Sequence, residues 1–166
     1  MKTINKLLLP LLLTVTTLSA IDKSYSFIGI QTGYANVHDK SMQSIGVKYG
    51  QQTKEYRTSF SYNYASKSNL TNQSLLLEVD RGIFKKDFKD LPFKPYAGIA
   101  LGVMEERNKG GAPSKDRGYL YGLSTGIAYI ANDHLDFDLS YRYLRTHQME
   151  NIDEINNINL ALHYFY

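Results

Sequence analysis

The chain has 166 residues, a length that favours a single domain, and its formal net charge of +3 comes without a basic stripe, so nucleic-acid binding is not expected. It contains no cysteine, which excludes disulfides, a lipoprotein anchor, thiol catalysis and cysteine metal sites. A content of 14 Tyr, 7 Phe and 12 Gly against only 4 Pro favours an all-β protein with aromatic belts.

Residues 1–20 are typical of a secretory signal peptide. Two lysines form the positive n-region, residues 7–15 form the apolar h-region, and the segment ends in the small residues that a cleavage site requires. The alternative is an N-terminal membrane anchor, but the apolar run is too short to span a bilayer and Ser and Thr residues follow it. We therefore expect export and a mature domain over residues 21–166.

Apolar and polar residues alternate with a period of two along the mature chain, which predicts eight β-strands. The predicted strands are 25–35, 44–51, 55–65, 74–82, 94–107, 118–131, 135–145 and 157–166. Leu76 is an exception, because it falls on the polar face of its strand. A tilted strand of these lengths crosses a bilayer with half of its side chains facing lipid. The pattern therefore predicts an eight-stranded antiparallel up-and-down transmembrane β-barrel, whose interior has just enough room for side chains.

The predicted connections alternate between long and short. The segments 36–42, 67–72, 108–117 and 146–156 form the longer loops, and the turns between them are only a few residues long. Bacterial barrels place long loops outside the cell and short turns in the periplasm, so we expect both termini in the periplasm. The Lys/Asp-rich turn over residues 84–92 is longer than this pattern predicts, and the sequence offers no physical reason for its length.

The last ten residues, NINLALHYFY, resemble the C-terminal strand of Gram-negative outer-membrane proteins. The matching residues are Ile158, Leu160, Leu162, Tyr164 and Tyr166, although the family usually ends in Phe. The stretches KPYAGIALGV and LDFDLSYRYL are similar to the OmpA-like and small-porin superfamily. The resemblance implies a location in the cell outer membrane and recognition of the last strand by the barrel-assembly machinery. It does not extend to the peptidoglycan-binding domain of OmpA itself, because no sequence remains for one.

A soluble up-and-down barrel such as a lipocalin is the main alternative fold, with apolar side chains inside and polar ones outside. Two features of the pattern oppose it. The apolar face of the predicted strands carries almost no charge across the strand middles, and the interior of eight strands is too narrow for so many Tyr, Phe and Leu side chains.

Charged residues of both signs fall in the phase of the predicted lumen: Lys48, Arg57, Glu78, Asp80, Asp136, Asp138 and Arg142. They should pair, because an unpaired buried charge is costly. One interpretation is a salt-bridged plug, which we favour, and the other is a small gated ion path. Glu78 and Arg57 are the expected first pair, since their strands are adjacent and antiparallel.

No catalytic or metal site is expected, and no cofactor. His38, His134, His147 and His163 lack the spacing of metal ligands. PagL-like lipid A deacylases use a His-Ser pair with an acidic residue near the last strands, but the segment around His147 lacks the adjacent Ser. Palmitoyl transfer of the PagP kind requires a lipid-sized cavity, which no sequence feature identifies.

The predicted outer rim carries six basic residues: Lys67, Arg107, Lys109, Lys115, Arg117 and Arg145. These side chains either bind the phosphates of lipopolysaccharide or remain solvated loop charges, and the sequence does not separate the two. The favoured hypothesis is a monomeric structural or surface-interaction barrel that contacts outer-membrane lipids and lipopolysaccharide. A narrow porin-like channel is the alternative, and a lipid A-modifying enzyme is the third.

Overall fold

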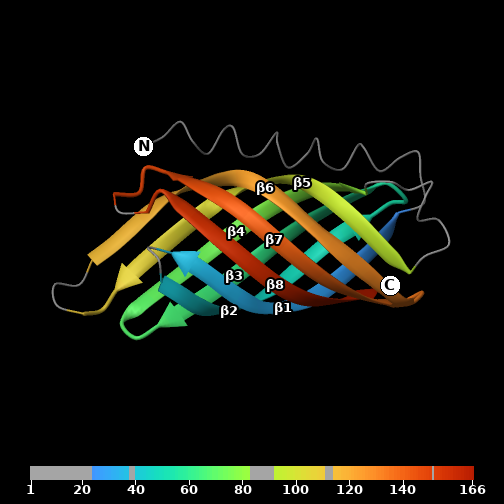
Figure 1. The fold of residues 1–166 in the computed structure, drawn as a ribbon, viewed down its shortest axis with the longest axis horizontal. Helices are drawn as coiled ribbons and strands as arrows, with labels where there is room; N and C mark the ends of the chain where they lie inside the picture. The colour runs from blue at the N-terminus through green and yellow to red at the C-terminus, as the bar shows by residue number, and fades with distance from the viewer. Residues whose placement is uncertain (1–23, 38–39, 83–91, 111–113, 151) are drawn as a thin grey trace.

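The computed structural model describes residues 24–37, 40–82, 92–110, 114–150 and 152–166. These residues form eight antiparallel strands in a closed barrel, in which each strand pairs with its sequence neighbours and the first pairs with the last (Figure 1). The strands are β1 Tyr25–Val37, β2 Lys40–Gln52, β3 Tyr56–Lys67, β4 Leu70–Gly82, β5 Phe93–Asn108, β6 Ser114–Asn132, β7 Leu135–His147 and β8 Glu154–Phe165. The predicted all-β up-and-down barrel is therefore confirmed. The described residues include no helix that is long and apolar enough to cross a bilayer.

The two ends of the barrel differ. The end that we call the terminal end holds the start of β1, the end of β8 and the connections at residues 53–55 and 133–134 (Figure 1, right). The opposite end, which we call the loop end, holds the ends of β1, β3, β5 and β7 and the starts of the strands that follow them (Figure 1, left). The predicted signal peptide and nearly all of the predicted turn at 84–92 lie outside the described residues.

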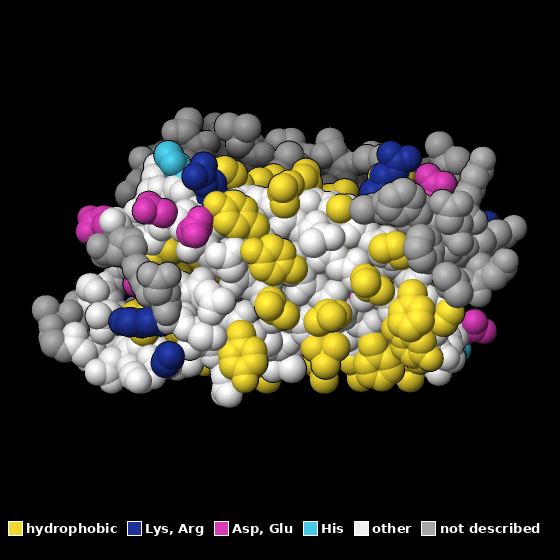
Figure 2. Space-filling model, in the orientation of Figure 1, with side chains coloured by type: hydrophobic (Ala, Val, Ile, Leu, Met, Phe, Trp, Pro, Cys, Tyr) yellow, Lys and Arg dark blue, Asp and Glu magenta, His cyan; other side chains and the backbone are white. Residues whose placement is uncertain are grey.

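The period-two pattern decides which side chains face out. In β3, the hydroxyl side chains of Ser59 and Ser61 are buried inside the barrel, whereas the ring of Phe60 between them is exposed outside. Ile30 in β1 and Leu123 in β6 are more than 60% exposed. On the face shown in Figure 2, hydrophobic side chains cover the middle of the barrel and charged ones gather towards its ends. An apolar belt of this kind is suited to lipid rather than water, so the soluble barrel with an apolar interior is excluded.

The strands are longer at the loop end than the sequence predicts. The β1–β2 ladder continues to the pair Val37 and Lys40, and the β3–β4 ladder continues to Lys67 and Leu70. Ser68 has a φ of 52°, a left-handed conformation of the kind that tight hairpin connections use. The predicted long loops at 36–42 and 67–72 are therefore wrong, because backbone pairing extends through these polar segments.

Glycines on the inner face make room for large polar side chains. A Cβ added to Gly126 would lie only 2.5 Å from the hydroxyl of Tyr96, and one added to Gly29 would collide with the ring of His163. Real Cβ atoms do not approach other atoms so closely, so either side chain has to shift if its glycine is replaced. The small residues of the inward phase thus allow the lumen to hold the few bulky polar groups described next.

Candidate functional site

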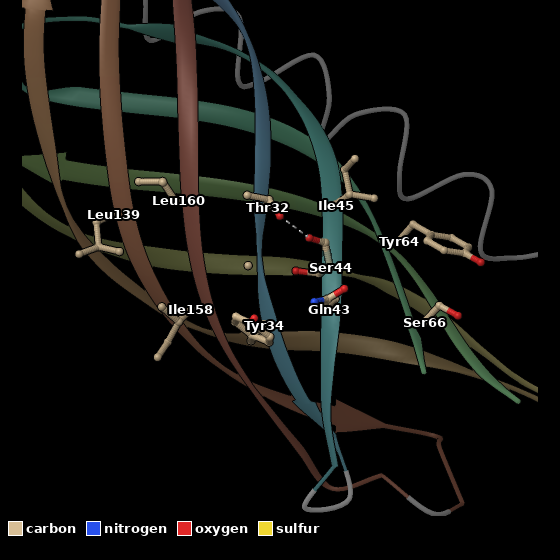
Figure 3. A pocket seen from close by; sticks show the side chains of 11 residues that line it. Thr32, Tyr34, Gln43, Ser44, Ile45, Tyr64, Ser66, Leu139, Ile158 and Leu160 are labelled. Carbon is tan, nitrogen blue, oxygen red and sulfur yellow. Dashed lines mark hydrogen bonds between the residues drawn. The ribbon is translucent and has the colours of Figure 1, made fainter. Parts of the chain in front are cut away.

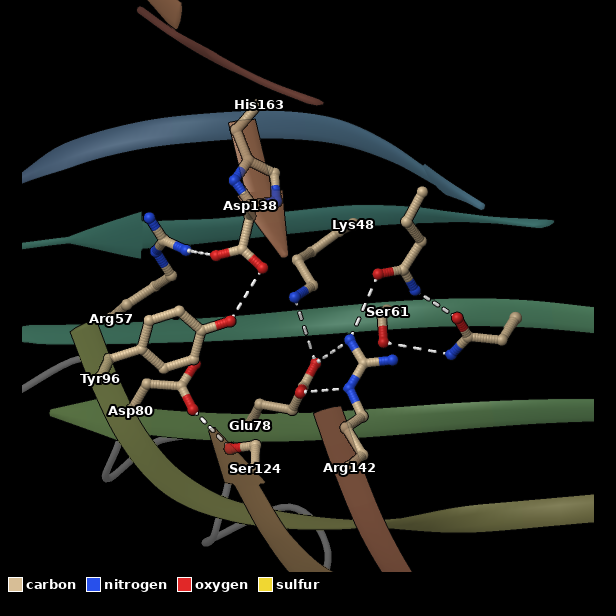
Figure 4. Close-up of polar contacts among 12 residues, drawn as sticks. Lys48, Arg57, Ser61, Glu78, Asp80, Tyr96, Ser124, Asp138, Arg142 and His163 are labelled. Carbon is tan, nitrogen blue, oxygen red and sulfur yellow. Dashed lines mark hydrogen bonds and ion pairs between the residues drawn. The ribbon is translucent and has the colours of Figure 1, made fainter. Parts of the chain in front are cut away.

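The charged side chains predicted to face the lumen all do so. Each of the seven is 7% exposed or less. They come from β2, β3, β4 and β7, and ion pairs and hydrogen bonds join most of them across the barrel (Figure 4). We refer to these seven residues, with the polar side chains that contact them, as the lumen network. Most of its contacts form two clusters, and Asp80 pairs with Ser124.

The first cluster surrounds the carboxylate of Glu78. The Arg142 guanidinium donates from Nε to Oε1 at 2.7 Å and from Nη2 to Oε2 at 3.1 Å. Lys48 Nζ lies 3.4 Å from Oε2 of the same carboxylate, and Arg142 also donates to Gln31 Oε1 at 3.2 Å. These contacts connect β1, β2, β4 and β7, which belong to different parts of the barrel wall. A bidentate arginine–carboxylate pair of this kind is among the stronger polar contacts available to side chains.

The second cluster surrounds the guanidinium of Arg57. Its Nη1 donates to Asp138 Oδ2 at 2.7 Å and its Nη2 donates to Asp136 Oδ2 at 2.8 Å. The guanidinium carbon also lies 5.6 Å from the ring centroids of both Phe27 and Tyr96. One arginine therefore binds two carboxylates of β7 while lying between two aromatic rings, which compensates for its removal from water.

The predicted pair of Glu78 with Arg57 is wrong. In the β3–β4 ladder, Arg57 lies opposite Asp80 and Glu78 lies opposite Ser59. Both charged side chains instead bind partners on β7, because inward-facing groups in a narrow barrel reach the far wall as easily as the next strand.

Five further polar side chains that the sequence did not single out join the network: Gln31, Gln52, Tyr96, Ser124 and His163. Tyr96 donates its hydroxyl to Asp138 at 2.8 Å, and His163 Nδ1 lies 2.7 Å from Asp136 Oδ1. Ser124 donates to Asp80 at 2.6 Å. The period-two phase places Gln31, Tyr96, Ser124 and His163 inward, whereas Gln52 lies just past the predicted end of its strand. The phase does not reveal which partner each side chain meets.

The lumen network lies between two apolar layers. At the terminal end, the rings of Phe27 and Phe165 are 5.3 Å apart and both are buried. Towards the loop end, buried side chains form an apolar cluster of Ala35, Val37, Met42, Ala65, Leu76, Ala100, Met104, Leu120, Leu144, Ile152 and Ile155. Leu76, the exception to the sequence pattern, is part of this cluster. A small internal cavity of about 30 Å³, lined by asparagines as well as by members of the cluster, adjoins it.

The outer wall has two grooves of interest. The first, of about 650 Å³, crosses β8, β1 and β2 at Thr32, whose hydroxyl donates to the Ser44 carbonyl at 3.1 Å (Figure 3). Its lining contains no Asp, Glu, Lys or Arg. The second, of about 450 Å³, crosses β3 to β6. It is lined by apolar residues, by the uncharged polar residues Gln73, Ser74 and Gln148, and by Glu105, Arg107 and Arg117. We refer to these as the neutral groove and the charged groove.

The six predicted rim cations do not form one group. Arg107, Lys115 and Arg117 all contact the carboxylate of Glu105. Lys67, Lys109 and Arg145 are exposed and take no part in that cluster.

Two kinds of site considered from the sequence, a His–Ser pair at His147 and a metal centre, are not found among the described residues. His147 lies opposite Tyr119 in the β6–β7 ladder rather than opposite a serine. Among the residues described, no three His, Cys, Asp or Glu side chains are placed to hold a metal ion. His38 lies outside the described residues.

Comparison with known proteins identifies the kind of barrel. A family model described as the outer membrane protein beta-barrel domain matches residues 12–165. The chain is similar to the crystal structure of Neisserial surface protein A (NspA), with 17% identity and a TM-score of 0.66 over 86% of this chain and 97% of that one. It is also similar to outer membrane protein H (OprH) from P. aeruginosa, with 20% identity and a TM-score of 0.63 over 86% and 99% of the two chains.

An enzyme is also among the similar structures. The outer membrane enzyme PagL has 11% identity and a TM-score of 0.52, with 82% of this chain and 97% of that one covered. Identities this low show a shared fold alone. No curated protein matches the sequence.

Proposed function

Because this chain belongs to the outer membrane protein β-barrel family and is therefore located in the outer membrane, we propose that it is a structural or surface-interaction barrel with a plugged lumen. The observation that carries the proposal is the lumen network, in which buried charges of both signs are paired across the barrel. The apolar cluster and the Phe27–Phe165 layer support it, since each obstructs the lumen on one side of the network.

Opening a path through the network requires Arg57 or Arg142 to leave its carboxylates inside the barrel. Removing one partner from a buried ion pair costs about 3–5 kcal/mol. Every 1.4 kcal/mol corresponds to about a tenfold change in population, so roughly one molecule in a hundred or fewer is open at that cost. A gated narrow channel, the alternative function, therefore requires a trigger that the network alone does not supply.

Planar-bilayer conductance tests the plug. Wild-type protein purified from outer membranes is expected to give no stable conductance steps, whereas a general porin reconstituted in the same way serves as the positive control. Reproducible steps from the wild-type protein, absent from mock-purified membranes, contradict the plug and favour the channel.

The proposed role does not include catalysis. PagL has a similar fold, so the fold by itself does not decide the matter, but His147, the histidine considered for such a site, lies opposite Tyr119 rather than opposite a serine. Mass spectrometry of lipid A incubated with the purified protein is the test. Loss or gain of an acyl chain overturns the non-enzymatic role.

In the proposed orientation, the terminal end faces the periplasm and the loop end faces outwards, as in bacterial barrels with an even number of strands. The signal peptide at residues 1–20 is removed on export. Ile158, Leu160, Leu162, Tyr164 and Tyr166 form the signal that the barrel-assembly machinery reads. Outer-membrane lipids and lipopolysaccharide surround the apolar belt as partners.

A further inference from the structure

A square of four charged side chains lies on the outer wall near the loop end of β5 and β6. In the β5–β6 ladder, Glu105 lies opposite Arg117 and Arg107 lies opposite Lys115. Arg117 Nε is 2.6 Å and Lys115 Nζ is 3.0 Å from Glu105 Oε2, and Arg107 Nε contacts Oε1. The glutamate thus draws three cations from two strands into one small area of the surface.

The square has an excess of positive charge. Three cations against one carboxylate leave a net charge of +2. Both arginines reach Glu105 through Nε, so their Nη groups are not used by that carboxylate and remain available to an anion. The cations are between 44% and 67% exposed, whereas Glu105 beneath them is 16% exposed. An incoming anion therefore meets guanidinium and ammonium groups rather than the carboxylate.

The charged groove extends from this square onto the apolar belt. Leu75, Val103 and Tyr119 line it together with Glu105 and the two arginines. Val103 lies two residues before Glu105 in β5, and Tyr119 lies two residues after Arg117 in β6. Both therefore point outwards like the charged residues but lie nearer the middle of the barrel. The groove of about 450 Å³ therefore has cationic side chains at its outer edge and apolar ones towards the membrane.

We propose that the charged groove binds a phosphate-bearing lipid of the outer leaflet, with the phosphate held by Arg107, Lys115 and Arg117 and an acyl chain lying against Leu75 and Val103. This rests on the proposed function, because it requires the loop end to face outwards. Arginine suits the role since its planar donors match phosphate oxygens in pairs. Charge complementarity selects an anionic headgroup, and the apolar part of the groove selects a lipid over a free anion.

The neutral groove provides the matched comparison. It also lies on the outer wall, but its lining carries hydroxyl and amide groups in place of charges. A lipid bound in the neutral groove meets no charged side chain, so its binding should not depend on a phosphate in the headgroup. Changes there should leave the preference for phosphate intact.

The test measures binding of diphosphoryl lipid A and of chemically dephosphorylated lipid A to protein purified from outer membranes in a neutral detergent, by native mass spectrometry. Wild type is expected to prefer the phosphorylated lipid by roughly 10-fold to 100-fold, since each charge-assisted hydrogen bond contributes a substantial part of such a ratio. The double variant Arg107→Gln, Arg117→Gln should lose most of this preference. The double variant Gln43→Ala, Ser66→Ala in the neutral groove should retain it.

Competition with inorganic phosphate distinguishes a site for the phosphate of a lipid from a site for free phosphate. Failure of millimolar phosphate to displace lipid A supports the lipid site, and complete displacement identifies a site for free anions and overturns the proposal. Equal preference in wild type and the arginine double variant also overturns it.

Heat-modifiable migration on a gel checks that each variant is folded. If the arginine double variant does not fold, the single variant Lys115→Gln takes its place in the binding measurement. These substitutions lie on the outer wall and should not change the conductance through the lumen. Failure of the proposed plug would therefore be seen in conductance, and failure of the lipid site in lipid binding.

Discussion

Arg142 illustrates how much a single residue contributes to this interior. Its side chain has no exposed surface, and its guanidinium holds both oxygens of Glu78. A charge removed from water is stable only when a partner and hydrogen bonds replace its hydration. Glu78 depends on Arg142 in turn, because Lys48 at 3.4 Å is its other cation in the network.

Replacing Arg142 with Met should destabilise the barrel by about 3–5 kcal/mol, since Glu78 is left buried with a single, more distant cation. Urea unfolding of the protein refolded into lipid vesicles measures this change. Arg145→Met, on the same strand but exposed, should stay within about 0.5 kcal/mol of wild type. Similar losses in both variants contradict the structural importance of the network.

At the scale of elements, β4 shows how a strand serves two environments. Leu75 faces out and is 38% exposed, and Leu76, the next residue, is fully buried in the apolar cluster. Successive side chains of a strand point to opposite faces, so one short apolar run contributes to both the lipid-facing belt and the interior. Most of the buried hydrophobic residues gather towards the loop end, where they separate the lumen network from the ends of the strands.

Leu76→Ala should therefore cost about 2–5 kcal/mol of unfolding free energy, because the tightly packed cluster is left with a cavity. Leu75→Ala should cost clearly less, since lipid chains fill the space that its side chain leaves on the outer wall. Denaturant unfolding in vesicles compares the two. A larger loss for Leu75 than for Leu76 excludes the apolar cluster as a packed layer.

At the scale of the whole molecule, the barrel is closed by β1 and β8. Their ladder runs from Phe27 and Phe165 to Val37 and Ile155, and the Tyr166 amide donates to the Ser26 carbonyl at 3.1 Å. Closure removes the exposed strand edges that cannot exist in a bilayer, because lipid offers no hydrogen bonds to the backbone. The backbone bond of Tyr166 does not depend on its ring, which is 65% exposed.

Tyr166→Ser should therefore leave refolding in detergent unchanged, because the backbone bond to Ser26 does not need the ring. If the assembly machinery reads the aromatic ring, as proposed, the variant should assemble less well in cells. Heat-modifiable protein in isolated outer membranes, compared with that obtained by refolding, measures the difference. Tyr129→Ser, which removes another exposed aromatic ring in β6, is the control. Equal assembly of the two variants in cells contradicts a special role for the last residue.

The sequence alone predicts the number of strands, their inward and outward faces and the burial of the seven charged residues. These features depend on the period-two alternation, which is a local property of each strand. The same alternation placed His163 and Gln31 inward. It did not predict the length of the strands near the loop end, because polar segments such as 67–72 are held by backbone hydrogen bonds to the neighbouring strand, which composition does not report.

Only the tertiary structure decides which groups meet inside and outside the barrel. Arg57 binds Asp136 and Asp138, which are about half the chain away, because closure brings β7 within its reach. In the same way, the register of β5 against β6 places three cations on Glu105 and leaves Lys67 apart. Partner choice depends on register and closure, which involve all eight strands at once, whereas the facing of a side chain depends on its own strand.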